Sequence, residues 1–230
     1  MVFAITPSPH ASVPVRGGKP FPVRRIYCVG RNYAAHAREM GHDPDREPPF
    51  FFMKPADAVT FDGGAIPYPP ATNDLHHEIE LVVALAKGGA DIPEDRALEH
   101  VFGYTVGLDM TRRDLQAEAK AKGRPWDTGK GFDHSAPIGA LRTVADIGHP
   151  TDARIHLRVN GETRQDGNIN QMIWNIPETI SYLSGLFHMR PGDLIFTGTP
   201  AGVGAVVPGD RLEGAVEGVA SLSISYDPKS

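Results

Sequence analysis

The feature that most constrains the fold is an apolar run that begins with two carboxylates, in the stretch HHEIELVVAL over residues 76–85. Apolar and β-branched residues dominate 78–86, which predicts a strand beside a hydrophobic core. An unpaired carboxylate next to a core is energetically costly, so Glu78 and Glu80 require a compensating partner. The nature of that partner bears directly on function.

Several other segments have the alternation or the turn residues of β-strands. The segment ARIHLRVNGETRQDG (153–167) alternates apolar and polar residues up to an Asn160-Gly161 turn, a strong hairpin signal. Pro-Gly-Asp precedes a predicted strand in both RPGDLIFTG (190–198) and VPGDRLEG (207–214), which suggests paired β-hairpins. Further strands are predicted in RRIYCVG (24–30), HVFGYTVGLD (100–109) and ASLSISY (220–226).

Helical patterns are fewer. Helices are predicted in RNYAAHAREMG (31–41), MTRRDLQAEAKAKG (110–123) and NIPETISYLSGLF (175–187). Dense Pro and Gly over 47–72 predict loops and short strands. Because strands outnumber helices and do not alternate regularly with them, the fold class is a mixed, β-rich α+β fold and not a doubly wound sheet.

The length of the chain indicates a single core. With 230 residues, of which 40% are apolar, the chain can bury one substantial core but hardly two. Residues 1–23 are rich in Pro, Ser and Gly and predict an extended N-terminal arm. We therefore expect a single domain over 24–230.

Composition also limits the partners and the compartment. The net charge is −5 and the basic residues are scattered, which argues against nucleic-acid binding and favours a small-molecule partner. Neither a signal peptide nor a membrane-length apolar run is apparent, so no membrane partner is expected. A lone Cys28 excludes a disulfide framework and suits the cytoplasm.

Three carboxylates suggest a metal site. On a strand, Glu78 and Glu80 face the same side, and Asp109 follows the apolar strand 100–109. Three carboxylates without a nearby cysteine suit a hard ion such as Mg²⁺ or Mn²⁺. The alternatives are a solvated strand face for the Glu pair, the commoner case for an isolated Glu-x-Glu, and a helix cap for Asp109.

Histidine and lysine residues add candidates for catalysis. His36 and Glu39 lie three residues apart on one face of the predicted helix, where the carboxylate can orient the imidazole as a general base. A surface pair is the alternative. His76 and His77 point to opposite faces of a strand, so at most one joins the Glu pair.

Two glycine-rich stretches favour anion binding. Lys130 lies in DTGKGFD (127–133), where flanking glycines allow a ligand to approach the backbone and the lysine can pair with an anion. The segment TGTPAGVG (197–204) can bind a carboxylate through hydroxyls and backbone N–H groups, although a plain turn explains it equally well.

Seven segments, in order, together closely resemble the fumarylacetoacetate hydrolase family, and within it the compact bacterial fumarylpyruvate hydrolases and acylpyruvases. These are YCVGRNYAAHAREMG, FFMKPADAV, HHEIELVVAL, YTVGLDMTRRDLQ, KGFDHSAPIG, NINQMIWNIPETISYLS and PGDLIFTGTPAGVG. The resemblance covers the chain from about Arg24 onward. It implies a mixed β-sandwich roll, a catalytic domain over 24–230 and a homodimer.

The resemblance also implies a site. The implied ligands of one divalent ion, Mg²⁺ or Mn²⁺, are Glu78, Glu80 and Asp109. The implied catalytic residues are the water-activating pair His36 and Glu39, together with Lys130. The implied substrate contacts are Arg113, Gln116 and Thr199, and Arg31 is a further candidate for binding an anionic substrate.

The activity that the resemblance implies is hydrolysis of a carbon–carbon bond in a 2,4-diketo acid, with fumarylpyruvate giving fumarate and pyruvate in aromatic catabolism. Oxaloacetate decarboxylation and isomerisation of a ring-cleavage product are rivals on the same scaffold. A non-catalytic keto-acid-binding module is a rival of another class. The His36/Glu39 pair speaks against the last, since binding alone needs no base.

Overall fold

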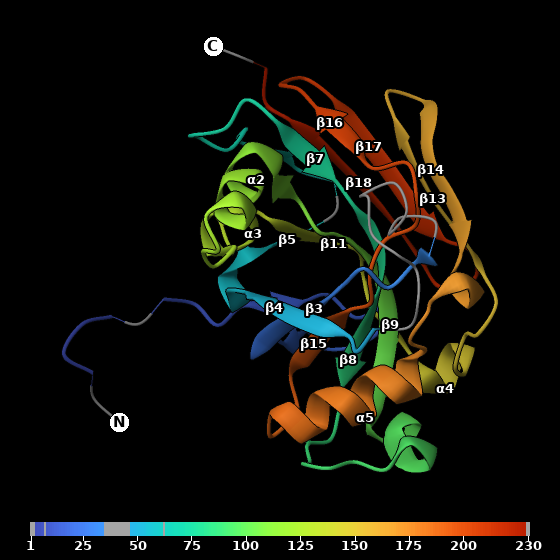
Figure 1. The fold of residues 1–230 in the computed structure, drawn as a ribbon. Helices are drawn as coiled ribbons and strands as arrows, with labels where there is room; N and C mark the ends of the chain where they lie inside the picture. Colours follow the sequence, from blue (N-terminus) through green and yellow to red (C-terminus); the bar gives the residue numbers. More distant parts are fainter. Residues whose placement is uncertain (1–2, 7, 35–46, 62, 229–230) are drawn as a thin grey trace.

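The computed structural model describes residues 3–6, 8–34, 47–61 and 63–228 (Figure 1). Its largest element is a mixed sheet in the order β4-β3-β15-β8-β9-β11-β5, with β12 also paired to β9. Strands β15 and β3 run parallel, as do β11 and β5, and the other pairs are antiparallel. The strands are β3 (Arg25–Gly30), β4 (Phe50–Lys54), β5 (Val59–Phe61), β8 (Ile79–Leu85), β9 (Val101–Leu108), β11 (Ala136–Ile138), β12 (Arg142–Thr143) and β15 (Asp193–Phe196).

A second sheet packs against the first. Its order is β14-β13-β17-β18-β6, from β6 (Ala65–Ile66), β13 (Arg154–Val159), β14 (Glu162–Asn168), β17 (Arg211–Val216) and β18 (Ala220–Tyr226). Gly214 of β17 lies so close to Ile79 of β8 that a Cβ would stand 2.6 Å from the Ile79 Cδ1 atom. The lack of a side chain at Gly214 thus permits the close approach of the two sheets.

Short strands and helices complete the fold. Two small sheets pair β1 (Ser12–Val13) with β2 (Phe21–Pro22), and β10 (Thr111–Arg112) with β7 (Leu75–His77) and β16 (Gly204–Val206). In Figure 1, α2 and α3 lie on the side of the molecule away from β13 and β14, and α5 runs along the lower end. The helices are η1 (Ala56–Ala58), η2 (Glu94–His100), α2 (Arg113–Ala121), α3 (Asp127–Lys130), α4 (Val144–Ile147), η3 (Ile169–Gln171) and α5 (Ile176–Leu186).

The central strand β8 explains the apolar run in the sequence. All seven of its residues are buried. Its odd-numbered side chains, such as Leu81, join the core between the two sheets, whereas Val82 and Ala84 join a second cluster on the opposite face. By the two-residue period of a strand, Glu78 and Glu80 share the face of Val82 and Ala84. The carboxylates are therefore held inside the protein by the same strand that builds its core.

Most of the predicted elements are confirmed, including the β-rich α+β class. The Asn160-Gly161 turn joins β13 to β14, with φ angles of 52° and 82° that fit the favoured hairpin turn. Asn175 caps α5 in a reciprocal capping box with Glu178. The predicted helix at 31–41 falls mostly outside the described residues. Among the described residues, no helix combines the length and the apolar character needed to cross a membrane.

The prediction of paired hairpins at the two Pro-Gly-Asp turns is wrong. The first turn precedes β15, which is inserted between β3 and β8. The second turn, at 208–210, precedes β17, whose hairpin with β18 is closed by residues 217–219 and not by that turn. A tight turn specifies a local reversal of the chain, but the buried side chains decide beside which strand the chain continues.

The N-terminal segment has two parts. Its described residues before Ala11 are exposed and extend away from the body of the molecule (Figure 1). Beyond Ala11, Val13, Phe21 and Val23 are buried in the second core cluster together with Ile26 of β3. The part from 12 to 23 thus belongs to the packed fold and is not a loosely held arm.

Candidate metal centre and active site

Three carboxylates converge at the start of β8. Oxygens of Glu78, Glu80 and Asp109 lie within 4.8 Å of one another, and at most 5% of each residue is exposed. Strand register produces this arrangement: Glu80 stands opposite Gly107 in the β8–β9 pair, and the Asp109 N–H donates to the Glu78 carbonyl at 2.8 Å. The two alternatives from sequence are thus excluded, because the Glu pair is not solvated and Arg112, not Asp109, occupies the N-cap of α2.

The chemistry of this cluster fits a divalent cation. Burial, followed by the charges of Asp109 and Glu78, raises the pKa of Glu80 well above its ordinary value. Asp109 Oδ1 is buried and accepts no hydrogen bond. Buried carboxylates with unused oxygen lone pairs are the donors that Mg²⁺ and Mn²⁺ prefer. These three residues therefore could hold such an ion, which would balance the charge that the sequence places beside the core.

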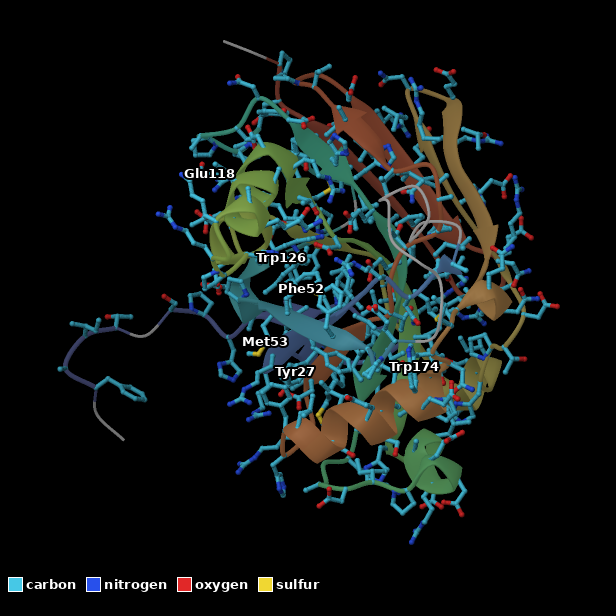
Figure 2. All side chains as sticks on the ribbon, in the orientation of Figure 1. Tyr27, Phe52, Met53, Glu118, Trp126 and Trp174 are labelled. Atoms are coloured by element: carbon cyan, nitrogen blue, oxygen red, sulfur yellow. The ribbon has the colours of Figure 1, made fainter. Side chains whose placement is uncertain are left out.

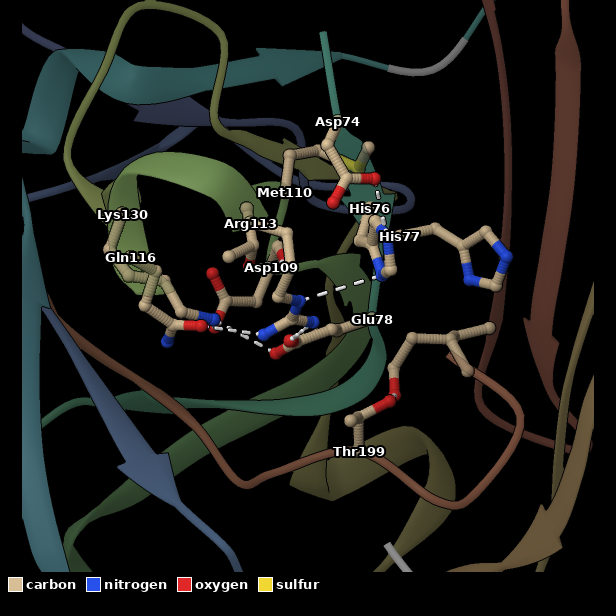
Figure 3. Close-up of polar contacts among 12 residues, drawn as sticks. Asp74, His76, His77, Glu78, Asp109, Met110, Arg113, Gln116, Lys130 and Thr199 are labelled. Carbon is tan, nitrogen blue, oxygen red and sulfur yellow. Dashed lines mark hydrogen bonds and ion pairs between the residues drawn. The ribbon is translucent and has the colours of Figure 1, made fainter. Parts of the chain in front are cut away.

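Lys130 lies directly against the carboxylates. Its Nζ donates to Glu78 Oε2 at 2.9 Å and to Asp109 Oδ2 at 2.6 Å (Figure 3). Burial alone would lower the pKa of Lys130, but the charges of Asp109 and Glu78 outweigh it and raise the pKa. The side chain is thus a buried ammonium ion, positioned by the short helix α3.

Lys54 is a second buried lysine at the site, and sequence analysis missed it. Its Nζ lies 2.8 Å from Asp109 Oδ1, in an ion pair without hydrogen-bond geometry, and donates to the carbonyls of Met110, at 3.0 Å, and Lys130. The available signal was a lysine that ends an otherwise apolar strand, FFFMK, just before Pro55. Lys54 therefore ties the Asp109 strand to the helix that carries Lys130.

The helix α2 presents two further polar side chains. Arg113 donates through Nη2 to Glu78 Oε1 at 2.5 Å and through Nη1 to Gln116 Oε1 at 2.7 Å (Figure 3). Because Gln116 is three residues along the helix, it shares a face with Arg113. Thr111 and Asp114 have the spacing of a capping box, but no side chain caps α2, and Asp114 accepts a hydrogen bond from the Thr72 hydroxyl at 2.7 Å.

The turn after β15 is fixed to the carboxylate cluster and to the start of β8. The Gly198 N–H donates to Glu80 Oε2 at 2.8 Å, and the Thr199 hydroxyl donates to the Ile79 carbonyl at 2.7 Å. Gly198 has a φ of +93°, and a Cβ there would lie 2.7 Å from the Cβ of Asn32. Glycine is therefore required at the position that brings the turn against Glu80.

A single cavity brings the described site residues together. It is lined by all eight described residues of the predicted site, namely Arg31, Glu78, Glu80, Asp109, Arg113, Gln116, Lys130 and Thr199. Sequence analysis missed Lys120, Trp126, Phe50 and Phe52, which also line it. Figure 2 shows Phe52 and Trp126 side by side, with ring centroids 5.9 Å apart.

Cationic side chains of the cavity lie against its aromatic rings, as Lys120 does over Trp126 at 5.0 Å from the ring centroid. Burial, and then the charges of Arg113 and Arg31, lower the pKa of Lys120. The Arg31 guanidinium lies 5.3 Å from the centroid of the Phe50 ring. An anionic, partly apolar small molecule is the kind of ligand that complements such a surface.

Four predicted candidates either lie outside the described residues or do not line the cavity. His36 and Glu39 lie outside the described residues. Neither His76 nor His77 belongs to the carboxylate cluster, as the former pairs with Asp74 and the latter with Gln165. The prediction is that at most one of these histidines joins the Glu pair. In the structure neither of them does.

Comparison with known proteins decides the family. Residues 25–224 match the family described as fumarylacetoacetate (FAA) hydrolase C-terminal. The chain belongs to this family. A crystal structure of a family relative, fumarylpyruvate hydrolase from Pseudomonas aeruginosa in complex with Mn²⁺ and pyruvate, is 56% identical, with a TM-score of 0.97 over 99% of this chain and 100% of that one.

Two curated relatives differ in their stated activity. Fumarylpyruvate hydrolase of a Ralstonia species is 46% identical over 82% of this chain and 99% of its own. Mitochondrial oxaloacetate tautomerase of Rattus norvegicus is 45% identical over 89% of this chain and 92% of its own. Membership of the family thus establishes the fold and the type of site. Because the relatives differ in activity, the reaction has to be inferred from the residues that line the cavity.

Proposed function

We propose that this protein is a divalent-metal-dependent hydrolase that cleaves fumarylpyruvate, a 2,4-diketo acid, into fumarate and pyruvate. One water is consumed: its hydroxyl bonds to the acyl carbon, the carbon–carbon bond breaks, and the pyruvate carbon takes up a proton. The observation that carries the proposal is the cavity, where three buried carboxylates face a wall of cationic side chains. The Pseudomonas relative, with Mn²⁺ and pyruvate in its structure, has the same overall fold.

The carboxylates are the proposed ligands of one Mg²⁺ or Mn²⁺ ion per subunit. Such an ion supplies a Lewis acid that withdraws electron density from a bound keto acid. Glu78, Glu80 and Asp109 would hold it, while Arg113 and Lys130 orient the carboxylates of Glu78 and Asp109 through the hydrogen bonds described above.

Cationic and amide groups are the proposed substrate contacts. Arg31 and Arg113 line the cavity together with Gln116, and guanidinium groups bind carboxylates in a bidentate manner. A fumarylpyruvate dianion offers one carboxylate at each end. We propose that these side chains hold the substrate so that its scissile bond lies close to Lys130.

The proposed base is His36, oriented by Glu39. Support comes from their spacing on the predicted helix and from the family resemblance. A general base removes a proton from the attacking water as its oxygen bonds to the acyl carbon. Lys130 would stabilise the negative charge that develops in this step.

Oxaloacetate is a second candidate substrate. The similarity to the rat oxaloacetate tautomerase favours it, and oxaloacetate is also a small dianionic 2-keto acid. Its decarboxylation or tautomerisation requires no activated water. The test is to incubate the purified, Mn²⁺-loaded protein with fumarylpyruvate, shorter acylpyruvates and oxaloacetate at equal concentration. Fumarylpyruvate should have the largest kcat/KM, and a larger value for oxaloacetate would reverse the assignment.

We further propose a homodimer in the cytoplasm, each of whose subunits carries one catalytic domain that includes the packed residues 12–23. Strand β4 ends the sheet order, and the apolar side chains of Met53, Tyr182 and Leu186 are 41%, 39% and 57% exposed. A strand edge without a partner among the described residues, and exposed apolar side chains, are features that a second subunit can cover. Sedimentation equilibrium at micromolar concentration should give twice the chain mass, and a monomer would contradict the dimer.

A further inference from the structure

The second sheet sends one buried amide toward the metal-binding strand. Gln165 on β14 is fully buried, whereas its neighbours Arg164 and Asp166 are exposed. The pairing of β13 and β14 shifts between Leu157 and Arg158, so that Gln165 and not Arg164 stands opposite Leu157. This β-bulge turns the amide inward and keeps the arginine in solvent.

All four hydrogen-bonding positions of the Gln165 amide are used. The Ile79 N–H donates to Oε1 at 3.0 Å, and His77 Nδ1 lies 2.9 Å from the same oxygen. The amide nitrogen donates to Thr199 Oγ1 at 2.8 Å and to the Pro200 carbonyl at 2.9 Å. A backbone N–H can only donate and a carbonyl can only accept, so the orientation of the amide is fixed by its partners.

The two ends of this amide hold two parts of the site. Its oxygen binds the backbone of Ile79, the residue between Glu78 and Glu80, and its nitrogen binds the turn that carries Thr199. The Thr199 hydroxyl accepts from Gln165 while donating its proton to the Ile79 carbonyl. With its proton and one lone pair engaged, that hydroxyl retains only an acceptor position for a ligand.

Close backbone packing supports this connection. A Cβ on Gly202, which has a φ of +90°, would lie 2.2 Å from the Arg164 carbonyl oxygen. A Cβ on Gly167 would lie 2.8 Å from the Cβ of Pro200. The loop after Thr199 is therefore seated directly on the bulged segment of β14.

We propose that Gln165 is a positioning residue for this site. Its oxygen holds the backbone of Ile79, between the two proposed glutamate ligands. Its nitrogen orients the Thr199 hydroxyl, which therefore offers the cavity an acceptor and not a donor to an oxyanion. This inference rests on the proposed hydrolase function for its catalytic consequence. Its consequence for metal binding does not depend on which substrate is turned over.

The first test is Gln165→Leu in the full chain. Loss of a residue that orients metal ligands costs about 10- to 100-fold in metal affinity or activity, so the Mn²⁺ Kd by calorimetry and kcat should both worsen by that factor. The control is Thr163→Val, at an exposed position of the same strand, which should leave both unchanged. A folded Gln165→Leu protein with the Kd and kcat of wild type would overturn the proposal.

Gln165→Glu tests the oxygen and the nitrogen of the amide separately. It is also the alternative test if Gln165→Leu fails to fold. A glutamate keeps an acceptor for Ile79 and His77 but cannot donate to Thr199 or Pro200. We expect kcat to fall by about 10-fold or more, while Mn²⁺ binds at least as tightly as in wild type. An unchanged kcat would show that the Thr199 end is irrelevant, and weakened Mn²⁺ binding would contradict the role of the Ile79 end.

A double-mutant cycle with Thr199→Val separates positioning from general damage. If Gln165 acts through the Thr199 hydroxyl, the kcat penalty of Gln165→Glu should largely vanish in the Thr199→Val background. Penalties that multiply would overturn this part of the proposal. A wild-type protein that binds Mn²⁺ but does not cleave fumarylpyruvate refutes the hydrolase function alone, because the Mn²⁺ measurements still decide the role of Gln165.

Discussion

Replacing Lys54 with methionine should destabilise the protein strongly, and more so without metal. The substitution preserves the length of the side chain but removes the ion pair with Asp109 at 2.8 Å and two hydrogen bonds to backbone carbonyls. Both charged side chains are at most 1% exposed, so water cannot replace these contacts. Breaking a buried ion pair costs about 3–5 kcal/mol.

The same change should be milder when Mn²⁺ is bound, because the ion supplies the positive charge that Asp109 loses. The carbonyls of Met110 and Lys130 lose their donor in both states, so bound Mn²⁺ relieves only the part of the loss that comes from the ion pair. In a domain of this size 1 kcal/mol corresponds to roughly 2–4 °C in Tm, so the apo protein should lose about 6–20 °C.

The assay is thermal unfolding followed by circular dichroism, in EDTA and in saturating Mn²⁺. The control is Lys122→Met. Lys122 is half exposed and pairs with Glu118 at the surface, so its loss should cost less than about 1 kcal/mol. A Lys54→Met loss no larger than that of Lys122→Met would refute the role of Lys54. An equal loss in EDTA and in Mn²⁺ would refute the link between Lys54 and the metal site.

Four further variants test the proposed roles. Glu78→Gln and Asp109→Asn should each abolish Mn²⁺ binding in calorimetry while the circular dichroism spectrum is kept, and unchanged affinity would remove that residue from the ligands. His36→Ala should cost roughly a hundredfold in kcat for fumarylpyruvate, the usual scale for a lost general base, but much less for oxaloacetate decarboxylation; equal losses would mean that His36 does not activate water. Arg113→Met should raise KM by roughly tenfold or more, because a charge-assisted hydrogen bond contributes about 1.5–3 kcal/mol, and an unchanged KM would speak against a substrate contact.

Local periodicity suggested the carboxylate cluster but left a solvated strand face and a helix cap open, and the family resemblance favoured the metal site over them. Glu78 and Glu80 are two residues apart on a strand, so their side chains lie on the same face. Asp109 follows an apolar strand, and its carboxylate lies beside theirs when the two strands pair. The family resemblance added Lys130, Arg113, Gln116 and Thr199, all of which the structure places at one cavity.

The residues that sequence analysis missed are those whose role depends on long-range packing. Lys54 reaches Asp109 only because β4 and the strand pair β8–β9 belong to one sheet. Gln165 reaches Ile79 only through a bulge in the other sheet, and nothing in the local sequence signals that shift of register. The place of β15 between β3 and β8 was missed for the same reason, since a turn motif does not specify the partner strand.

The most direct test of the central claim is to follow Mn²⁺ occupancy and fumarylpyruvate cleavage in one titration of the metal-free protein. Electron paramagnetic resonance reports free Mn²⁺, and the loss of substrate absorbance reports turnover. We predict no cleavage without metal and a rate that rises in proportion to occupancy, up to one ion per subunit. Cleavage by the metal-free protein, or full occupancy of this site without cleavage, would contradict a metal-dependent hydrolase built on Glu78, Glu80 and Asp109.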